Sequence, residues 1–318
     1  MRFSTYSGLF LSVLIYFSIN TVYSQEISGL NLAFSSNFNG DWEIYLLNAE
    51  NGIPFNITRS KMADYYPFWS PDGRRIVFFS NRDRNNEIYI MDSDGKNQTR
   101  LTYDPSLDKA PCWSPSGDKI AFNTNRDGNF EIYIMMVNGQ GQKNLTNTAA
   151  DEETPAWSPD GKIIAFSSKR DGNWEIYTMN HEGEDQTRLT DNPGLDSYPA
   201  WSSDGKRIAY TSMRQGDMEI FVMPSTGGED INLTKDQGAD DAVPSWSPDD
   251  SMIAYQHELN GNWVIAIMKS DGSDKKIITD SDAWYVQPKW CPVSSVFTDV
   301  EYNKTNSKWS EVKIKPLP

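Results

Sequence analysis

Short apolar runs alternate with polar turns along almost the whole chain. A representative stretch contains Ile120-Ala121-Phe122, a polar turn at 126–129 and a second run from Glu131 to Met135. Short apolar runs bounded by Gly, Asn and Asp are typical of β-strands. No stretch keeps the 3.6-residue apolar period of an amphipathic helix over two turns. The pattern therefore predicts an all-β fold.

One tryptophan position recurs at intervals of 44 or 45 residues, and a proline stands two residues before each of these tryptophans. The six positions are Trp69, Trp113, Trp157, Trp201, Trp246 and Trp290. A period in the forties is typical of arrays of four-stranded units. Each unit contains four predicted strands, A to D, with the patterns Pro-x-Trp, Ile-Ala-Phe, Glu-Ile-Tyr and Leu-Thr. A turn such as Pro71-Asp72-Gly73 joins strands A and B.

The first and last units are complementary. Strand A is missing before Leu32-Ala33-Phe34, and a spare strand A, Pro288-Lys289-Trp290, follows the last unit. A ring needs this offset, because the C-terminal strand then completes the first blade and leaves no open sheet edge. A solenoid would instead need a capping repeat at each end. We predict a six-bladed β-propeller of four-stranded blades, closed by a C-terminal strand that completes blade 1.

The N-terminal 24 residues resemble a secretory signal peptide. Arg2 precedes an apolar run from Leu9 to Ile19, and small or tolerated residues stand before Gln25. The run is about half of the roughly 20 residues that a membrane span needs, although an uncleaved anchor is the alternative. We expect a signal peptide at 1–24, the propeller at 25–292 and a tail at 293–318. The tail is expected to form a hairpin of 296–302 with 308–315, and the protein to be periplasmic or secreted.

Composition narrows the function classes. The chain has 318 residues, 44 acidic and 29 basic, and a formal net charge of −15. This balance opposes nucleic-acid binding, which needs clustered cations, and a hydrophobic content of 38% opposes an integral membrane protein. Two histidines are too few for multi-histidine metal chemistry. The two cysteines, Cys112 and Cys291, are expected to be buried thiols. We expect a monomer.

The repeated motif resembles the TolB-type, WD40-like propeller repeat. The motif is Trp-Ser-Pro-Asp-Gly-x-x-Ile-Ala-Phe, then Arg-Asp-Gly-Asn-x-Glu-Ile-Tyr-x-Met, then Leu-Thr, and it extends over residues 31 to 290. The resemblance implies a non-enzymatic scaffold of the cell envelope or the exterior. In bacterial TolB proteins such a propeller contacts peptidoglycan-associated lipoprotein and accepts peptide segments at its channel mouth. TolB also carries an α/β domain before the propeller, for which only a few residues are available after Gln25.

Two repeated features fall in the loops that share one face of such a ring. Loops between strands D and A place an acid three residues before the proline: Asp64, Asp108, Glu152, Asp196 and Asp241. Loops between strands B and C carry an arginine: Arg82, Arg126, Arg170 and Arg214. Their recurrence favours ion pairs that fix the loops. The alternative is an acidic ring at the channel mouth that attracts a basic peptide or Ca²⁺, although we expect no cofactor to be required.

Blades 6 and 1 depart from this pattern where the ring closes. Phe38 and Leu259 stand at the arginine positions, and Tyr285 stands at the acidic one. Trp42, Trp263 and Trp284 add aromatic side chains to the same loops. These six residues are candidate anchors for a partner segment, because exposed aromatic patches often mark binding sites. Simple apolar packing of the closing seam is the alternative.

Enzyme signatures were not found. The chain has no Gly-x-Ser-x-Gly nucleophile elbow, and His181 and His257 fall on different blades. We predict a non-enzymatic propeller that binds a protein or peptide at its loop-rich face, with an envelope lipoprotein as one partner to consider. The alternative is a glycan-binding or glycan-cleaving propeller that uses mouth carboxylates and seam aromatics.

Overall fold

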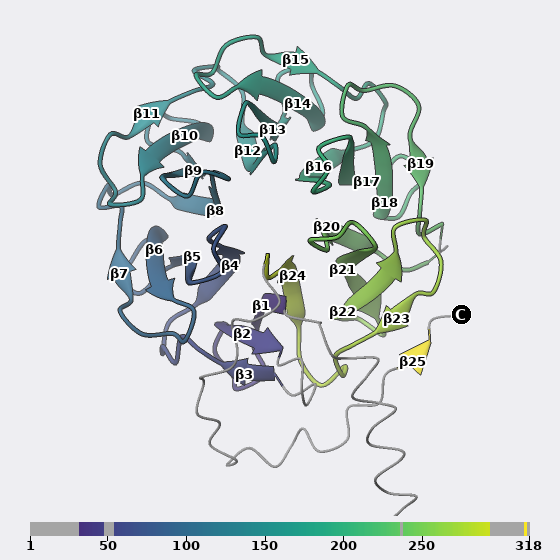
Figure 1. Cartoon of the computed structure of the whole chain (residues 1–318), viewed down its shortest axis with the longest axis horizontal. Coiled ribbons are helices and arrows are strands. Elements are labelled where there is room, and N and C mark those ends of the chain that lie inside the picture. Colours follow the sequence, from purple (N-terminus) through teal and green to yellow (C-terminus); the bar gives the residue numbers. More distant parts are fainter. Residues whose placement is uncertain (1–31, 48–53, 236–237, 293–314, 317–318) are drawn as a thin grey trace, which may run out of the picture.

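The computed structural model describes residues 32–47, 54–235, 238–292 and 315–316. The strands form six antiparallel sheets arranged as a ring around a central channel (Figure 1). The predicted all-β class and six-bladed architecture are confirmed.

Each blade runs from strand A at the channel to strand D at the rim. Blade 1 contains β24 (Tyr285–Trp290), β1 (Leu32–Ser36), β2 (Glu43–Leu47) and β3 (Pro54–Asn56). Blade 2 contains β4 (Asp64–Trp69), β5 (Arg75–Ser80), β6 (Glu87–Asp92) and β7 (Thr99–Arg100). Blade 3 contains β8 (Asp108–Trp113), β9 (Lys119–Thr124), β10 (Glu131–Met136) and β11 (Lys143–Asn144). Blade 4 contains β12 (Glu152–Trp157), β13 (Ile163–Ser168), β14 (Glu175–Asn180) and β15 (Thr187–Arg188).

The last two blades follow the same order. Blade 5 contains β16 (Asp196–Trp201), β17 (Arg207–Ser212), β18 (Glu219–Pro224) and β19 (Ile231–Asn232). Blade 6 contains β20 (Asp241–Trp246), β21 (Met252–Leu259), β22 (Asn262–Lys269), β23 (Lys276–Ile277) and a fifth strand, β25 (Lys315–Pro316).

The ring closes as the sequence predicts. β24 pairs antiparallel with β1, with Leu32 opposite Trp290 and Ser36 opposite Tyr285. The N- and C-terminal ends of the propeller therefore share one sheet. The expected signal peptide lies outside the described residues. So does the expected tail hairpin apart from Lys315, which pairs with Ile277 of blade 6.

The apolar core lies between neighbouring sheets. Ile120 and Phe122 of blade 3, for example, pack in one cluster with Val77 and Ile88 of blade 2. Both faces of the B and C strands are buried, which explains why their sequences are continuously apolar rather than alternating. Burial between blades makes each blade depend on its neighbours for stability.

The repeated tryptophan donates a hydrogen bond to the preceding blade at four of the six junctions. Trp201 Nε1 donates to Ala156 O at 3.1 Å, and Trp290 Nε1 donates to Ser245 O at 3.0 Å. Trp69 Nε1 donates to Lys289 O at 3.2 Å, so the same bond spans the closing seam. Trp113 and Trp157 lack this bond and only pack against apolar side chains of the preceding blade. The constant interval of the tryptophans thus reflects a shared position between neighbouring blades.

The Glu-Ile-Tyr and Leu-Thr motifs are explained by a single interaction that recurs in blades 1 to 5. In blade 2, Thr102 Oγ1 donates to Glu87 Oε2 at 2.6 Å and accepts from the Ile88 backbone N–H at 2.9 Å. Both side chains are buried. The pair satisfies polar groups that would otherwise be buried without partners, and it fixes the chain that follows the short strand D.

Every strand A contains a bulge at the residue before its proline. These six residues have positive φ angles: Tyr66, Ala110, Thr154, Tyr198, Val243 and Gln287. A left-handed conformation is strained for a β-branched residue such as Val243 (φ 54°). In blade 6 a hydrogen bond fixes the bulge, because the Val243 N–H donates to Thr211 Oγ1 of blade 5 at 3.0 Å. The bulge turns its side chain toward the channel.

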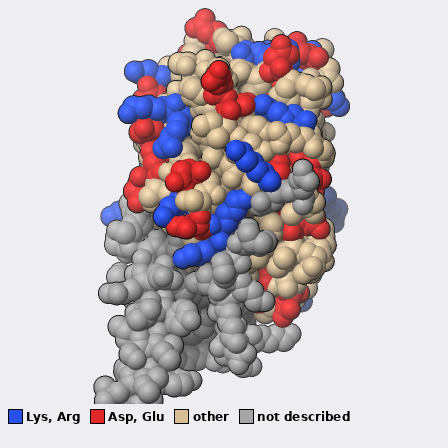
Figure 2. Space-filling view, turned by 90° about the vertical axis from the view of Figure 1, so that its right-hand side faces the viewer, with Lys and Arg blue, Asp and Glu red and all other residues tan. Residues whose placement is uncertain are grey.

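The outer surface carries charges of both signs. Figure 2 shows Lys and Arg interspersed with Asp and Glu on one side of the ring. Within the described ranges, no helix has the length and apolar character that a membrane crossing needs. Cys112 and Cys291 are buried thiols, as the sequence predicts.

Candidate binding sites at the two ends of the channel

The two ends of the channel differ in the chain segments that form them. At the loop-rich end, strands A begin beside the B–C loops: the Asp64 N–H donates to Trp42 O of the neighbouring blade at 2.9 Å. At the opposite end, which we call the tryptophan end, strands A finish at their tryptophans and continue into the Ser-Pro turns. The candidate residues predicted from the sequence lie at the loop-rich end.

The five repeated acids are completely buried. Four of them pair with the arginine of the B–C loop in their own blade. The N–O distances are 2.9 Å for Arg82–Asp64, 3.2 Å for Arg126–Asp108, 3.1 Å for Arg170–Glu152 and 3.3 Å for Arg214–Asp196. Each arginine also reaches a side chain at the D-strand side, such as Gln98 for Arg82 at 2.6 Å.

Burial and pairing have opposite effects on these carboxyl groups. Burial raises the pKa of Asp64, and the Arg82 guanidinium lowers it in part. The carboxylates do not line the channel mouth, so the distances support the ion-pair interpretation. No group of three or more His, Cys, Asp or Glu side chains among the described residues is placed to hold a metal ion. Calcium binding by the five acids stays a prediction, and it would require these ion pairs to open.

In blade 6 Leu259 stands at the arginine position, and His257, two residues earlier, is the partner of the buried acid instead, which the sequence reasoning missed. His257 Nδ1 lies 2.8 Å from Asp241 Oδ1, and both residues are buried. His257 stands directly opposite Asp241 in the strand pairing, where Ser80 stands opposite Asp64 in blade 2. Aligning the repeats column by column would have revealed this substitution.

Blade 1 replaces the ion pair with apolar and phenolic groups. Tyr285 is 0% exposed and donates to Asp280 Oδ1 at 2.6 Å. Burial raises the pKa of Tyr285 far above that of a free tyrosine. Phe38, at the arginine position, packs against the same apolar cluster. Both residues were predicted as partner anchors, but in this structure Tyr285 is inaccessible and Phe38 supports the core.

A cluster of one exposed and two half-buried aromatic side chains lies beside this buried pair. We call Trp42, Tyr65 and Trp284 the seam patch. The Trp42 ring lies 5.0 Å from Tyr65 and 6.4 Å from Trp284, measured between centroids. Trp284 is 40% exposed. The structure thus brings together two of the predicted anchors, Trp42 and Trp284, and adds Tyr65, which the sequence reasoning did not single out.

Blades 1 and 6 hold Trp284 from both sides. The Trp284 N–H donates to Asn37 Oδ1 of blade 1, and its Nε1 donates to Asn262 Oδ1 of blade 6, both at 2.9 Å. Asn262 begins β22, next to Trp263, at the end of a hairpin whose turn is Asn260-Gly261. Positive φ at both turn residues is typical of a type I′ turn. The half-buried Leu259 and Trp263 are therefore in the hairpin that adjoins the patch.

Two tyrosines divide the channel. Tyr66 comes from blade 2 and Tyr198 from the opposite blade 5, and their rings stack with centroids 6.5 Å apart. Burial raises the pKa of both hydroxyl groups. Glu153, one position nearer the loop-rich end in blade 4, also has a pKa raised by burial. Both rings also line the inner part of a pocket at the tryptophan end.

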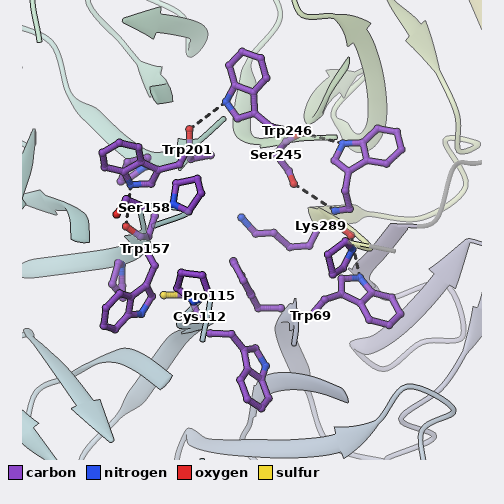
Figure 3. A pocket seen from close by; sticks show the side chains of 18 of the residues that line it. Trp69, Cys112, Pro115, Trp157, Ser158, Trp201, Ser245, Trp246 and Lys289 are labelled. Atoms are coloured by element: carbon purple, nitrogen blue, oxygen red, sulfur yellow. Dashed lines mark hydrogen bonds between the residues drawn. The ribbon is translucent and has the colours of Figure 1, made fainter. Parts of the chain in front are cut away.

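This pocket has a volume of about 400 Å³ and is lined by the tryptophans, the prolines of the A–B turns and the residues between proline and tryptophan (Figure 3). The last group comprises Phe68, Cys112, Ala156, Ala200, Ser245 and Lys289. Lys289 is the one charged residue among them, and its side chain points toward the middle of the pocket (Figure 3). The sequence reasoning missed this site, although a lysine in an otherwise uncharged repeat column was a visible signal.

Comparison with known proteins places the fold in a family. Residues 21–154 and 152–315 match the family described as TolB beta propeller domain. TolB from Acinetobacter baumannii has 23% sequence identity and a TM-score of 0.74, over 91% of this chain and 74% of that protein. A candidate TolB from Agrobacterium tumefaciens has 20% identity and a TM-score of 0.67, over 83% of this chain and 99% of its own.

A more distant propeller has the same shape. A chain of a nidogen/laminin complex has 12% identity and a TM-score of 0.67, over 84% of this chain and 99% of its own. At these identities the likeness concerns the fold alone. The sequence matches no curated protein. The family match extends over nearly the whole chain and agrees with the six blades and their repeated motif, so the chain belongs to the TolB β-propeller family.

Proposed function

We propose that this protein is a non-enzymatic, exported scaffold that binds a protein or peptide partner at its loop-rich end, through the seam patch. The fold is that of TolB propellers, and a propeller of the same shape occurs in a nidogen/laminin complex. The observation that carries the proposal is Trp284, which is exposed and yet fixed by hydrogen bonds from two blades.

A fixed, exposed tryptophan is suited to binding. Tryptophan is enriched among interface residues that dominate binding energy, and a side chain that is already ordered loses little entropy on association. Met62, 44% exposed, lies two residues before Asp64, whose N–H bonds to Trp42 O. Met62 thus adds exposed apolar surface in the loop that leads into β4, the strand of Tyr65. An envelope lipoprotein is one partner of this kind to test.

The glycan alternative receives less support from the geometry. Cleavage by mouth carboxylates needs an accessible acid and base, whereas the five repeated acids are buried with Arg or His partners. We therefore do not assign them a catalytic role. The exposed aromatic surface of the seam patch fits a partner bound without chemistry.

The test is capture of envelope proteins by the immobilised mature protein and by two matched variants. Trp284→Ala removes the fixed aromatic side chain. Tyr103→Ala removes an aromatic side chain that is 71% exposed in a D–A loop of the same end, between blades 2 and 3. We expect Trp284→Ala to weaken the captured partner's affinity about 10-fold or more and Tyr103→Ala to leave it unchanged. Equal affinity for wild type and Trp284→Ala would contradict the proposal.

A further inference from the structure

The pocket at the tryptophan end contains a cation without a counter-ion. Lys289 Nζ lies 5.5 Å from the centroid of the Phe68 ring. Among the described residues, no carboxylate and no hydrogen-bond acceptor contacts Nζ. Lys289 is half-buried, and it lines the pocket with the surface that stays exposed. A cation–π contact compensates only part of the hydration that a buried ammonium group loses.

The groups that surround Lys289 are neutral at pH 7. Burial raises the pKa of the Cys112 thiol to about 12, and it also raises the pKa of Tyr66 and Tyr198. Burial lowers the pKa of Lys289 to about 8, so this side chain is still mainly protonated at pH 7. The pocket therefore presents one positive charge in otherwise uncharged surroundings.

The other channel charges lie in the opposite compartment. Lys109 and Glu153 each stand one residue before the bulge position of their strands, nearer the loop-rich end. The stacked rings of Tyr66 and Tyr198 lie between these positions and the pocket. Lys109 Nζ lies 5.0 Å from the Phe130 ring. The Lys109 ammonium group lowers the pKa of Glu153 in part, whereas no carboxylate is among the groups that act on Lys289.

The walls of the pocket are flat and mainly apolar. Indole rings and proline rings form the outer part, Phe68, Ala156 and Ala200 the inner part, and the two tyrosine rings the floor. The volume, about 400 Å³, is in the range of small-molecule sites. This volume suits a small molecule or the end of a peptide.

We propose that this pocket binds a small monocarboxylate with a flat apolar body, whose carboxylate pairs with Lys289. Pairing gives the buried ammonium group the acceptor it lacks, while the apolar body packs on the indole and proline rings. A free organic acid and the C-terminal carboxylate of a peptide share this chemistry. The site lies at the far end of the channel from the seam patch and is independent of the function proposed above.

The experiment compares the affinities of a carboxylate ligand and of the neutral amide that has the same apolar group. Isothermal titration at pH 7 measures indole-3-acetate against indole-3-acetamide, and N-acetyl-Gly-Gly-Trp with a free C-terminus against its C-terminal amide. We expect wild type to prefer the carboxylate by about 10-fold or more in at least one pair, and the pair that binds identifies the source. Equal affinity for both members, or no binding of either pair, overturns the proposal.

Two lysine variants locate the effect. Lys289→Met should abolish the preference, whereas Lys109→Met, which removes the same charge from the other compartment, should retain it. Equal loss in both variants would indicate a general charge effect and overturn the assignment. Thermal unfolding checks that Lys289→Met is folded, and we expect it to be, because the variant removes an unpaired buried charge.

The pH dependence gives an independent readout. The anion binds the protonated form of Lys289, so affinity should fall as the pH rises above about 8. Between pH 7 and pH 9.5 the wild-type preference for the carboxylate should therefore be lost, while binding of the amide should change little. A preference that persists unchanged at pH 9.5 would exclude Lys289 as the partner of the carboxylate.

Discussion

Blades 2 to 5 differ from the closing blades 6 and 1 in the side chains that anchor the start of strand A to the B–C loop. In blades 2 to 5 a buried acid pairs with an arginine of the B–C loop. In blade 6 a histidine replaces the arginine, and in blade 1 Tyr285 and Phe38 replace both partners. The regular blades therefore use their loop charges for architecture, and the closing blades are free to vary.

The exceptions at the closing seam coincide with both candidate binding sites. Trp42, Trp284 and Lys289 all belong to blade 1 or to the loop that leads into it. Lys289 occupies a column in which the other five blades have uncharged residues. A repeat position that serves the fold recurs in most blades, whereas a position that serves a ligand needs to be filled only once. This difference separates structural from functional residues within one repeat.

The largest expected effect concerns the regular blades. Arg126→Met leaves the buried Asp108 without its cation, and we expect the free energy of unfolding to fall by about 3 kcal/mol in urea titrations at pH 7. The control is Arg74→Met, an exposed position in an A–B turn, with an expected change within about 0.5 kcal/mol. Similar values for both variants would show that the ion pair contributes little.

The next effect concerns the seam and has the opposite sign. Lys289→Met removes an ammonium group whose burial is unfavourable, so unfolding at pH 7 should require about 2 kcal/mol more than in wild type. Folding depresses the pKa of Lys289 from 10.5 to about 8, so the unfolded chain binds more protons between these pH values. The difference in unfolding free energy between Lys289→Met and wild type should accordingly shrink as the pH rises from 8 to 10.5. A difference that is independent of pH would indicate that packing, and not the buried charge, causes it.

The pattern of the chain predicted the fold because the contacts between neighbouring blades recur at a constant sequence interval. The Trp201–Ala156 bond recurs with the same spacing at other junctions, so the tryptophan interval alone indicates the blade unit. The complementary ends at Leu32 and Trp290 likewise predicted ring closure. Such contacts leave a periodic trace in one sequence.

The site residues were only partly predictable, because their roles depend on contacts across the ring. Nothing in the pattern shows that Tyr66 and Tyr198 meet across the channel, since they belong to opposite blades. Exposure also escaped the sequence: Trp284 and Tyr285 are neighbours, yet one is 40% exposed and the other is fully buried. Successive side chains of an extended segment point to opposite sides, so which of the two is buried depends on where β24 begins.

The smallest effect concerns the buried phenol of blade 1. Tyr285→Phe removes the hydrogen bond to Asp280 and keeps the ring in the apolar cluster, so we expect a loss of about 1 kcal/mol in unfolding free energy. This value should be smaller than that of Arg126→Met, because Asp280 is only half-buried and water can replace the phenol. Equal losses would mean that the two versions of the loop anchor are energetically equivalent.

The central claim is that the regular blades carry stability and the seam carries binding. The most direct test measures the unfolding free energy and the partner affinity for both Trp284→Ala and Arg126→Met, with affinity measured under conditions where each variant is folded. The account predicts that Trp284→Ala weakens partner affinity about 10-fold or more and lowers the unfolding free energy by less than about 1 kcal/mol. It predicts that Arg126→Met lowers the unfolding free energy by about 3 kcal/mol and leaves partner affinity unchanged. Loss of affinity in Arg126→Met with full affinity in Trp284→Ala would contradict it.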